Sequence, residues 1–182
     1  MKQLLFIISF FIICNSFSQN EQKTDTIGTD IFGAIYSLKN NTLFKSADDK
    51  TIDYKNYSLG DIATVDIINS REIIIFYLDY NTVVILDNQL NIITKIQFVQ
   101  TILFVNKGIV NNLWRYNDIQ NTLELYDYKS RKVTSSSQVI TDFEPVKMES
   151  NFNSVKLIGV NKTLLFDQYL NITETVIHQK ND

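Results

Sequence analysis

The sequence predicts an all-β protein, a β-propeller-like array of about four four-stranded antiparallel blades. The first observation is a repeat. Asn41, Asn81 and Asn121 each begin an Asn-Thr-Leu or Asn-Thr-Val triplet at a step of forty residues, and Asn161 begins a looser fourth copy. The second observation is side-chain alternation with a period of two, as in residues 92–98, which indicates strands and not helices. A period near forty combined with such alternation is typical of propeller blades.

The four blades are expected at about residues 27–56, 57–98, 99–139 and 140–178. The first blade has a weak first strand. In the second blade, strands are expected at about residues 62–68, 73–78, 83–86 and 92–98. Residues 73–78 are apolar on both faces, which predicts a strand covered on both sides, and the mixed residues 92–98 predict a wet outer edge. A polar loop is expected over residues 135–145. The pattern leaves open whether the blades close into a small ring or form an open, partial propeller.

Residues 1–18 are expected to be a secretory signal peptide, which leaves residues 19–182 as a single repeat domain. Lys2 precedes an apolar run over residues 4–14, and the small residues Ser16 and Ser18 suit cleavage. The protein is then exported, to the periplasm or the extracellular space. The alternative is a lipid anchor on Cys14, which is disfavoured because Ile13, and not a small residue, precedes it.

Two short motifs resemble known propeller repeats. Residues 30–36, with Asp30, Gly33 and Tyr36, resemble the start of blades in NHL-type and related bacterial propellers. Residues 87–92 resemble the turn of the same repeats, with Asn91 near the place of a glycine. The whole chain is similar to small exported bacterial propeller-like proteins, most of them uncharacterised. The resemblance implies an architecture and not an activity, and most such propellers have more than four blades.

The composition excludes several classes of function. The net charge is −3 and the few Arg residues are far apart, so no basic patch for a nucleic acid is expected. A single Cys and a single His exclude zinc sites built from these residues, and His178 is expected to be a solvated edge residue. No cofactor and no metal are expected, because Asp87, Asp127 and Asp167 stand singly before turns, where a carboxylate caps backbone N–H groups. No segment of the mature chain is long enough for a transmembrane helix.

Two sets of residues are candidates for a functional site. The first set lies in loops at the blade ends, where Tyr rings and carboxylates could contact a protein or carbohydrate partner. Its members are Tyr57, Asp79, Tyr80, Asn117, Asp118 and Glu144. The second set would form an oxygen-lined collar around the propeller axis, although turn capping is the simpler role for these side chains. Its members are Asp30, Asp66, Asn106 and Glu149.

These observations favour an exported, non-catalytic binding or interaction module whose ligand the sequence does not name. One alternative is a lyase or hydrolase that uses carboxylates and Tyr at the propeller axis. Another is a truncated propeller relative without a separate function. No catalytic residue is assigned under the favoured hypothesis.

Overall fold

The computed structural model describes residues 24–178, which form four antiparallel sheets of four strands each. Blade 1 contains β1 (Asp25–Thr29), β2 (Ile35–Lys39), β3 (Thr42–Ala47) and β4 (Lys50–Lys55). Blade 2 contains β5 (Thr64–Asp66), β6 (Ile73–Tyr77), β7 (Thr82–Leu86) and β8 (Ile92–Gln97). Blade 3 contains β9 (Ile102–Lys107), β10 (Asn112–Asn117), β11 (Thr122–Asp127) and β12 (Lys132–Ser136). Blade 4 contains β13 (Pro145–Ser150), β14 (Ser154–Gly159), β15 (Lys162–Asp167) and β16 (Ile172–Ile177).

Each sheet is a simple meander, with its strands paired in the order in which the chain runs. The expected all-β array of four-stranded antiparallel blades is therefore confirmed. The 3₁₀ turn η1 (Tyr57–Leu59) joins blade 1 to blade 2. None of the described residues forms a helix long and apolar enough to cross a membrane. The expected signal peptide, residues 1–18, lies outside the described residues.

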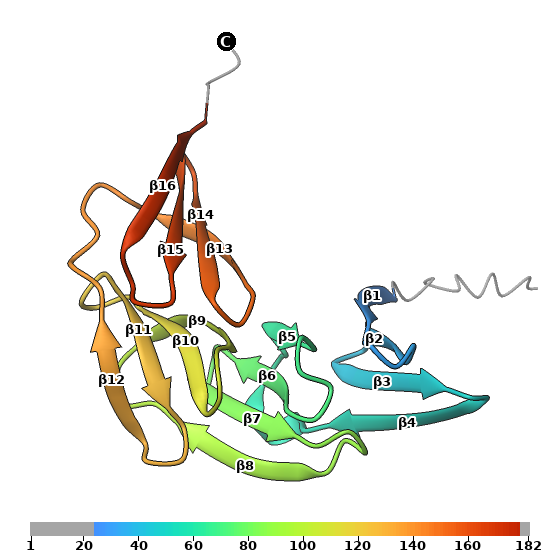
Figure 1. The fold of residues 1–182 in the computed structure, drawn as a ribbon. Helices are drawn as coiled ribbons and strands as arrows, with labels where there is room; N and C mark the ends of the chain where they lie inside the picture. The colour runs from blue at the N-terminus through green and yellow to red at the C-terminus, as the bar shows by residue number, and fades with distance from the viewer. Residues whose placement is uncertain (1–23, 179–182) are drawn as a thin grey trace, which may run out of the picture.

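The blades form an open arc and not a closed ring (Figure 1). Three apolar clusters join them in series. One cluster packs blade 1 on blade 2 around Tyr36 and Tyr77, the next packs blade 2 on blade 3 around Phe76 and Leu113, and the third packs blade 3 on blade 4. In the part of the chain that the structure describes, no such cluster joins blade 4 to blade 1. Figure 1 shows these two blades at opposite ends of the arc.

The repeated Asn residues explain how each blade is tied to the next. Asn81 has a left-handed φ of 47°, which Asn tolerates better than most residues. Its Nδ2 donates to the carbonyl of Phe98 at 3.0 Å, and its Oδ1 accepts the N–H of Ile102 at 3.2 Å. Asn41 holds Gly60 and Ile62 in the same way. A single side chain thus fixes both the hairpin and the crossing to the following blade.

Replacing Asn81 with Ala is expected to lower the free energy of unfolding by about 2–3 kcal/mol. Each lost hydrogen bond contributes about 0.5–1.5 kcal/mol, and Ala adopts the left-handed backbone less readily. Asn81→Gly removes the same hydrogen bonds without the backbone cost, so its loss should be smaller. Urea unfolding followed by Trp114 fluorescence measures both. Equal losses in the two variants would contradict the backbone contribution.

The repeated Asp residues cap turns, as expected from the sequence. Asp87 Oδ1 accepts the N–H groups of Gln89 and Asn91, both at 2.8 Å. Asp167 does the same eighty residues later, and Asp127 caps the corresponding turn of blade 3. Backbone hydrogen bonds lower the pKa of all three carboxyl groups.

The two end faces of the arc are more polar than the faces between blades. The face of blade 2 toward blade 3 pairs Ile74 with Ile85 and Phe76 with Val83. On the free face of blade 4, each of the matching cross-strand pairs includes a polar residue. They are Lys156 with Leu165 and Ile158 with Thr163. The free face of blade 1 likewise has Ser37 opposite Phe44 and Ser46 opposite Ile35. Both ends of the arc are therefore suited to contact with water.

Candidate functional site

The first predicted set of residues is divided between the surface and the core. Tyr57 and Tyr80 are 72% and 51% exposed, and they belong to neighbouring segments, because Asp79 lies against Gly60 just after η1. Asp118 is exposed in the turn after β10. Asn117 is fully buried and bonded within blade 3, as described below. Glu144 precedes β13, and its carbonyl accepts the N–H of Val160 at 3.3 Å.

The second predicted set is also divided. Asp66 and Asn106 line a cavity of about 380 Å³ on the inside of the arc, where the first strands of all four blades end. Thr29 and Ser150 line it with them. Asp30 caps its own turn, accepting the N–H groups of Phe32 and Ala34 at 2.9 and 3.0 Å. Glu149 forms an exposed ion pair of 2.7 Å with Lys147.

Both carboxylate oxygens of Asp66 already accept a hydrogen bond from the protein backbone. Its carboxylate accepts the N–H of Ile68 at 2.9 Å and the N–H of Lys107 at 2.7 Å. Burial nevertheless raises its pKa, because desolvation outweighs these hydrogen bonds. No group of three or more His, Cys, Asp or Glu side chains that could hold a metal ion occurs among residues 24–178.

A buried cation joins blades 2 and 3 near this cavity. Lys107 ends β9 and is 1% exposed, and its Nζ lies 3.2 Å from Glu72 Oε2 in the loop before β6. The same ammonium donates to the carbonyls of Gly108, at 3.1 Å, and Val110. The Tyr128 hydroxyl donates to the other oxygen of Glu72. Burial lowers the pKa of Lys107 although Glu72 acts in the opposite direction. Every charge in this cluster has protein partners, so the cluster serves the interface between the blades.

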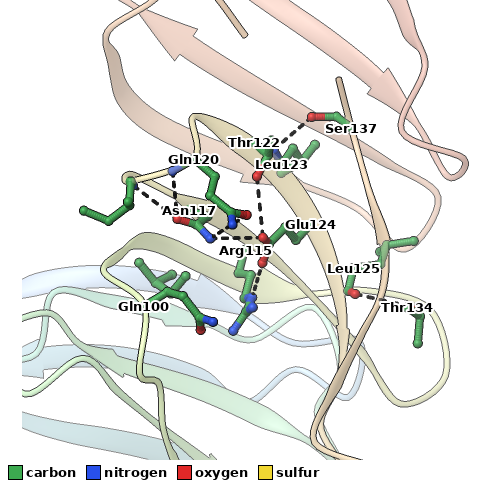
Figure 2. Close-up of polar contacts among 12 residues, drawn as sticks. Gln100, Arg115, Asn117, Gln120, Thr122, Leu123, Glu124, Leu125, Thr134 and Ser137 are labelled. Atoms are coloured by element: carbon green, nitrogen blue, oxygen red, sulfur yellow. Dashed lines mark hydrogen bonds and ion pairs between the residues drawn. The ribbon is translucent and has the colours of Figure 1, made fainter. Parts of the chain in front are cut away.

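A second buried ion pair lies in blade 3, on the face toward blade 2. Arg115 on β10 and Glu124 on β11 are cross-strand neighbours, and each side chain is 3% exposed. Arg115 Nε donates to Glu124 Oε2 at 2.6 Å, and Asn117 Nδ2 donates to Glu124 Oε1 at 3.1 Å (Figure 2). Both carboxylate oxygens of Glu124 are therefore hydrogen-bonded inside the blade.

The repeat shows what other blades place at these two positions. Forty residues earlier, blade 2 has the fully buried cross-strand pair Ile75 and Val84. Blade 4 has the buried pair Leu157 and Leu164. A buried ion pair is seldom more stabilising than well-packed apolar residues of similar volume. The charges at Arg115 and Glu124 are therefore candidates for a role other than packing.

These charged residues were absent from the sequence-based candidates, although the repeat contained the signal. Arg115 and Glu124 lie at strand positions that are apolar in blades 2 and 4, and comparison at a step of forty isolates them as departures. The sequence does not show that Arg115 and Glu124 are in contact. It also does not show that the Arg115 guanidinium stacks on two aromatic rings. The central carbon of the guanidinium lies 4.9 Å from the ring centre of Phe98 and 4.5 Å from that of Tyr126.

A groove of about 600 Å³ separates the outer parts of blades 3 and 4. The linker after β12 forms one wall, and β15, β16 and the turn between them form the other. Neutral hydrogen-bonding groups and apolar side chains share the lining, with one cation and no carboxylate. The main lining residues are Ser137, Gln138, Val139, Lys162, Phe166, Tyr169, Asn171, Ile172 and Thr175.

The groove exists because blade 3 lacks apolar residues at its outer edge. Ser137 donates its N–H to the carbonyl of Leu123, which is the position that Ile96 takes opposite Val83 in blade 2. Ile96 is 2% exposed and packs against blade 3, whereas Ser137 is too small and polar to reach blade 4. The outer strands β12 and β16 are exposed along their whole length.

No protein-family model matches the sequence. No curated protein matches it either. Solved structures do match the fold. A catalytically inactive histidine-to-alanine variant of virginiamycin B lyase from Staphylococcus aureus, with quinupristin, matches with a TM-score of 0.64 and 14% identity, over 90% of this chain and 58% of that chain.

Two other propellers match at similar levels. BamB from Moraxella catarrhalis matches with a TM-score of 0.59 and 10% identity, over 86% of this chain and 51% of that chain. The WD40 β-propeller domain of Doa1 matches with a TM-score of 0.60 and 7% identity, over 80% of this chain and 50% of that chain. This chain thus spans little more than half the length of the proteins it is similar to. At such low identities these likenesses establish the fold alone: the described residues are four blades of a β-propeller.

Proposed function

We propose that this protein is a non-catalytic binding module that holds an extended segment of a partner protein in the groove between blades 3 and 4. The observation that supports the proposal most directly is the position of the groove between two sheet edges. The outer strands β12 and β16 both contribute to its lining and both end their sheets. Unpaired backbone groups at a sheet edge can pair with an added strand, and side-chain pockets beside the edge then select its sequence.

The lining of the groove suits a neutral or acidic polypeptide. Ser137, Gln138 and Asn171 offer hydroxyl and amide groups to a peptide backbone, and Phe166 and Ile172 offer apolar contact. Lys162 is the charged residue of the lining, so an acidic side chain is the favoured charged contact. The volume of about 600 Å³ lies in the range of ordinary ligand sites, roughly 300–1,000 Å³.

The lyase among the structural neighbours raises the enzyme alternative. In the catalytically inactive variant of that lyase, one histidine is replaced by alanine, so the activity of that lyase depends on this histidine. The single His of the present chain, His178, follows β16 at the end of the arc and is exposed. Its Nε2 contacts Thr163 Oγ1 at 2.8 Å, and no carboxylate is among its described hydrogen-bond partners. A general base is better placed in a cleft beside an orienting group, so this placement favours the binding module.

The groove can be tested with one filled variant and one matched control. Thr175→Trp adds a large ring on the groove side of β16, and Val176→Trp adds the same ring on its opposite face. Ligands for the unaltered protein are selected from arrays of extended peptides and of glycans. We expect peptides to be selected, with binding at least about tenfold weaker after Thr175→Trp and unchanged after Val176→Trp.

Three outcomes would contradict the proposal. Selection of glycans alone would show that the ligand is a sugar and not a peptide. Equal binding by both Trp variants would show that the groove is not the binding site. Loss of binding in the double variant Tyr57→Ala/Tyr80→Ala, with binding retained in Thr175→Trp, would move the site to the loop face predicted from the sequence.

We also propose that the chain is exported, from its N-terminal sequence, and that its blades are of the NHL type, from the motif at residues 30–36. The mass of the protein recovered outside the cytoplasm tests the export. A chain that begins at Gln19 is expected, and a lipid adduct on Cys14 would replace free export with anchoring.

A further inference from the structure

The buried guanidinium of Arg115 faces a cavity of its own. A pocket of about 310 Å³ lies between blades 2 and 3, at the opposite side of blade 3 from the groove described above. The linker after β8 forms one wall, and β11 and the turn before β12 contribute the others. Its lining residues are Gln97, Phe98, Val99, Gln100, Arg115, Tyr126, Arg131 and Val133.

Arg115 enters this pocket with unused donors. Its Nε is bonded to Glu124, and none of residues 24–178 accepts a hydrogen bond from its two terminal nitrogens. Figure 2 shows the outer end of the guanidinium on the side of Gln100, away from Glu124. A side chain that is only 3% exposed and keeps two donor groups free toward a cavity is arranged for an acceptor supplied from outside.

The orientation of the guanidinium is fixed before any ligand arrives. Phe98 and Tyr126 lie edge to face, with ring centres 5.2 Å apart, and both rings contact the guanidinium. Glu124 holds Nε, and Asn117 in turn holds Glu124. Such stacking and hydrogen bonding leave the planar fork little freedom, which lowers the entropic cost of binding a planar acceptor.

The charge of the pocket selects an anion. Arg115 and Arg131 are its ionised lining residues, and Gln97 and Gln100 add carboxamide donors. No Asp or Glu lines the pocket; Glu124 lies behind it, where it balances the charge of Arg115 through Nε, so Arg131 supplies the excess positive charge. The remaining walls are the aromatic rings and two Val side chains. An acceptor with two coplanar oxygens on a small apolar body matches both the fork of Arg115 and these walls.

We propose that the pocket between blades 2 and 3 binds a carboxylate that is attached to a small apolar group. The terminal nitrogens of Arg115 hold both oxygens, Arg131 and Gln100 contribute at the mouth, and Phe98 and Val133 cover the apolar part. The carboxylate comes either from a free organic acid or from the C-terminus of a polypeptide. The site is separate from the groove between blades 3 and 4, and it does not depend on the function proposed for that groove.

Benzoate titrated into the ¹⁵N-labelled full-length protein tests the proposal. We expect saturable shifts of the Val99, Gln100 and Val133 amides and of the Arg115 Nε–H resonance. Sodium sulfate at the same ionic strength, as the comparison anion, should bind at least about tenfold more weakly, because a tetrahedral anion fits the planar fork and the apolar walls less well. Two versions of a short peptide, one with a free and one with an amidated C-terminus, distinguish a polypeptide C-terminus from a free organic acid as the source of the carboxylate. Tighter binding of the free form than of benzoate identifies a polypeptide end, and no gain identifies a free acid.

A charge introduced at the mouth provides the decisive variant. Gln100→Glu should weaken benzoate binding by at least about tenfold without unfolding the protein, because Gln100 is exposed in a linker. Gln89→Glu, the same change in the exposed turn before β8, is the matched control and should bind as the unaltered protein does. Arg115→Lys retains a cation beside Glu124 but lacks the fork, and it should lose the benzoate shifts. Non-saturable shifts, equal binding by the two Gln variants, or equal affinity for sulfate and benzoate would each overturn the proposal.

Discussion

The single substitution Arg115→Ile is expected to lower the free energy of unfolding by about 3–5 kcal/mol, the usual cost of leaving one member of a buried ion pair without its partner. Glu124 is 2% exposed. In the variant its carboxylate would keep the hydrogen bond from Asn117 but lose Arg115, the one cation paired with it among residues 24–178. The measurement is chemical denaturation at neutral pH. A loss below about 1 kcal/mol would contradict the cost expected for an unpaired, buried carboxylate at Glu124.

The double variant Arg115→Ile/Glu124→Val copies the pair that blade 2 has at the same positions, Ile75 and Val84. It should recover most of the stability lost in the single variant, and it could exceed that of the unaltered protein by about 1–4 kcal/mol. The same double variant should no longer bind benzoate. If stability is recovered and benzoate binding is lost, the two charges are needed for binding and not for packing. A double variant as unstable as Arg115→Ile would instead make the ion pair part of the architecture.

The substitution Lys107→Met is the other change with a large expected effect, about 3 kcal/mol of lost stability. The ammonium of Lys107 holds Glu72 of blade 2 and two carbonyls of blade 3, so its removal leaves buried acceptors without donors at the interface between these blades.

Lys132→Met, on the exposed strand β12, is the matched control and should change stability by less than about 0.5 kcal/mol. The double variant Lys107→Met/Glu72→Gln should regain part of the loss, because the unpaired charge is then absent. Similar effects of Lys107→Met and Lys132→Met would contradict an essential contact between the blades at this place.

The repeat made much of the fold predictable. Asn81 and Asp87 recur at a fixed step because each has a local structural role. Asn81 fixes a left-handed turn and the crossing to the next blade, and Asp87 caps a turn. Local roles leave local patterns, so blades and turns were accessible from the sequence. The apolar residues 73–78 likewise predicted a covered strand, and β6 is buried throughout.

The open form of the arc and the details of the sites were less accessible. Whether the blades close into a ring depends on the angle between neighbouring blades. That angle is set by the packing of many side chains between the blades, and no short sequence motif encodes it. The partners of Arg115 lie in different places along the chain, with Phe98 in a linker and Glu124 in the next strand. Asn117 looked like a loop residue because it precedes Asp118 in a turn, yet the network around Glu124 buries it.

The polar end faces have a consequence for how such a chain can change in length. A closed ring admits a new blade only if every existing angle adjusts, because the circle must still meet itself. An open arc has no such condition. One more unit of about forty residues can therefore be added without changing the angles between the existing blades. Where it could be added is nevertheless restricted. A unit joined at either end would have to cover Ser37 and Ser46 or Lys156 and Thr163, whereas a duplicate of blade 2 would meet apolar neighbours on both sides. Growth by duplication inside the arc is therefore the physically easier route to longer forms of this architecture.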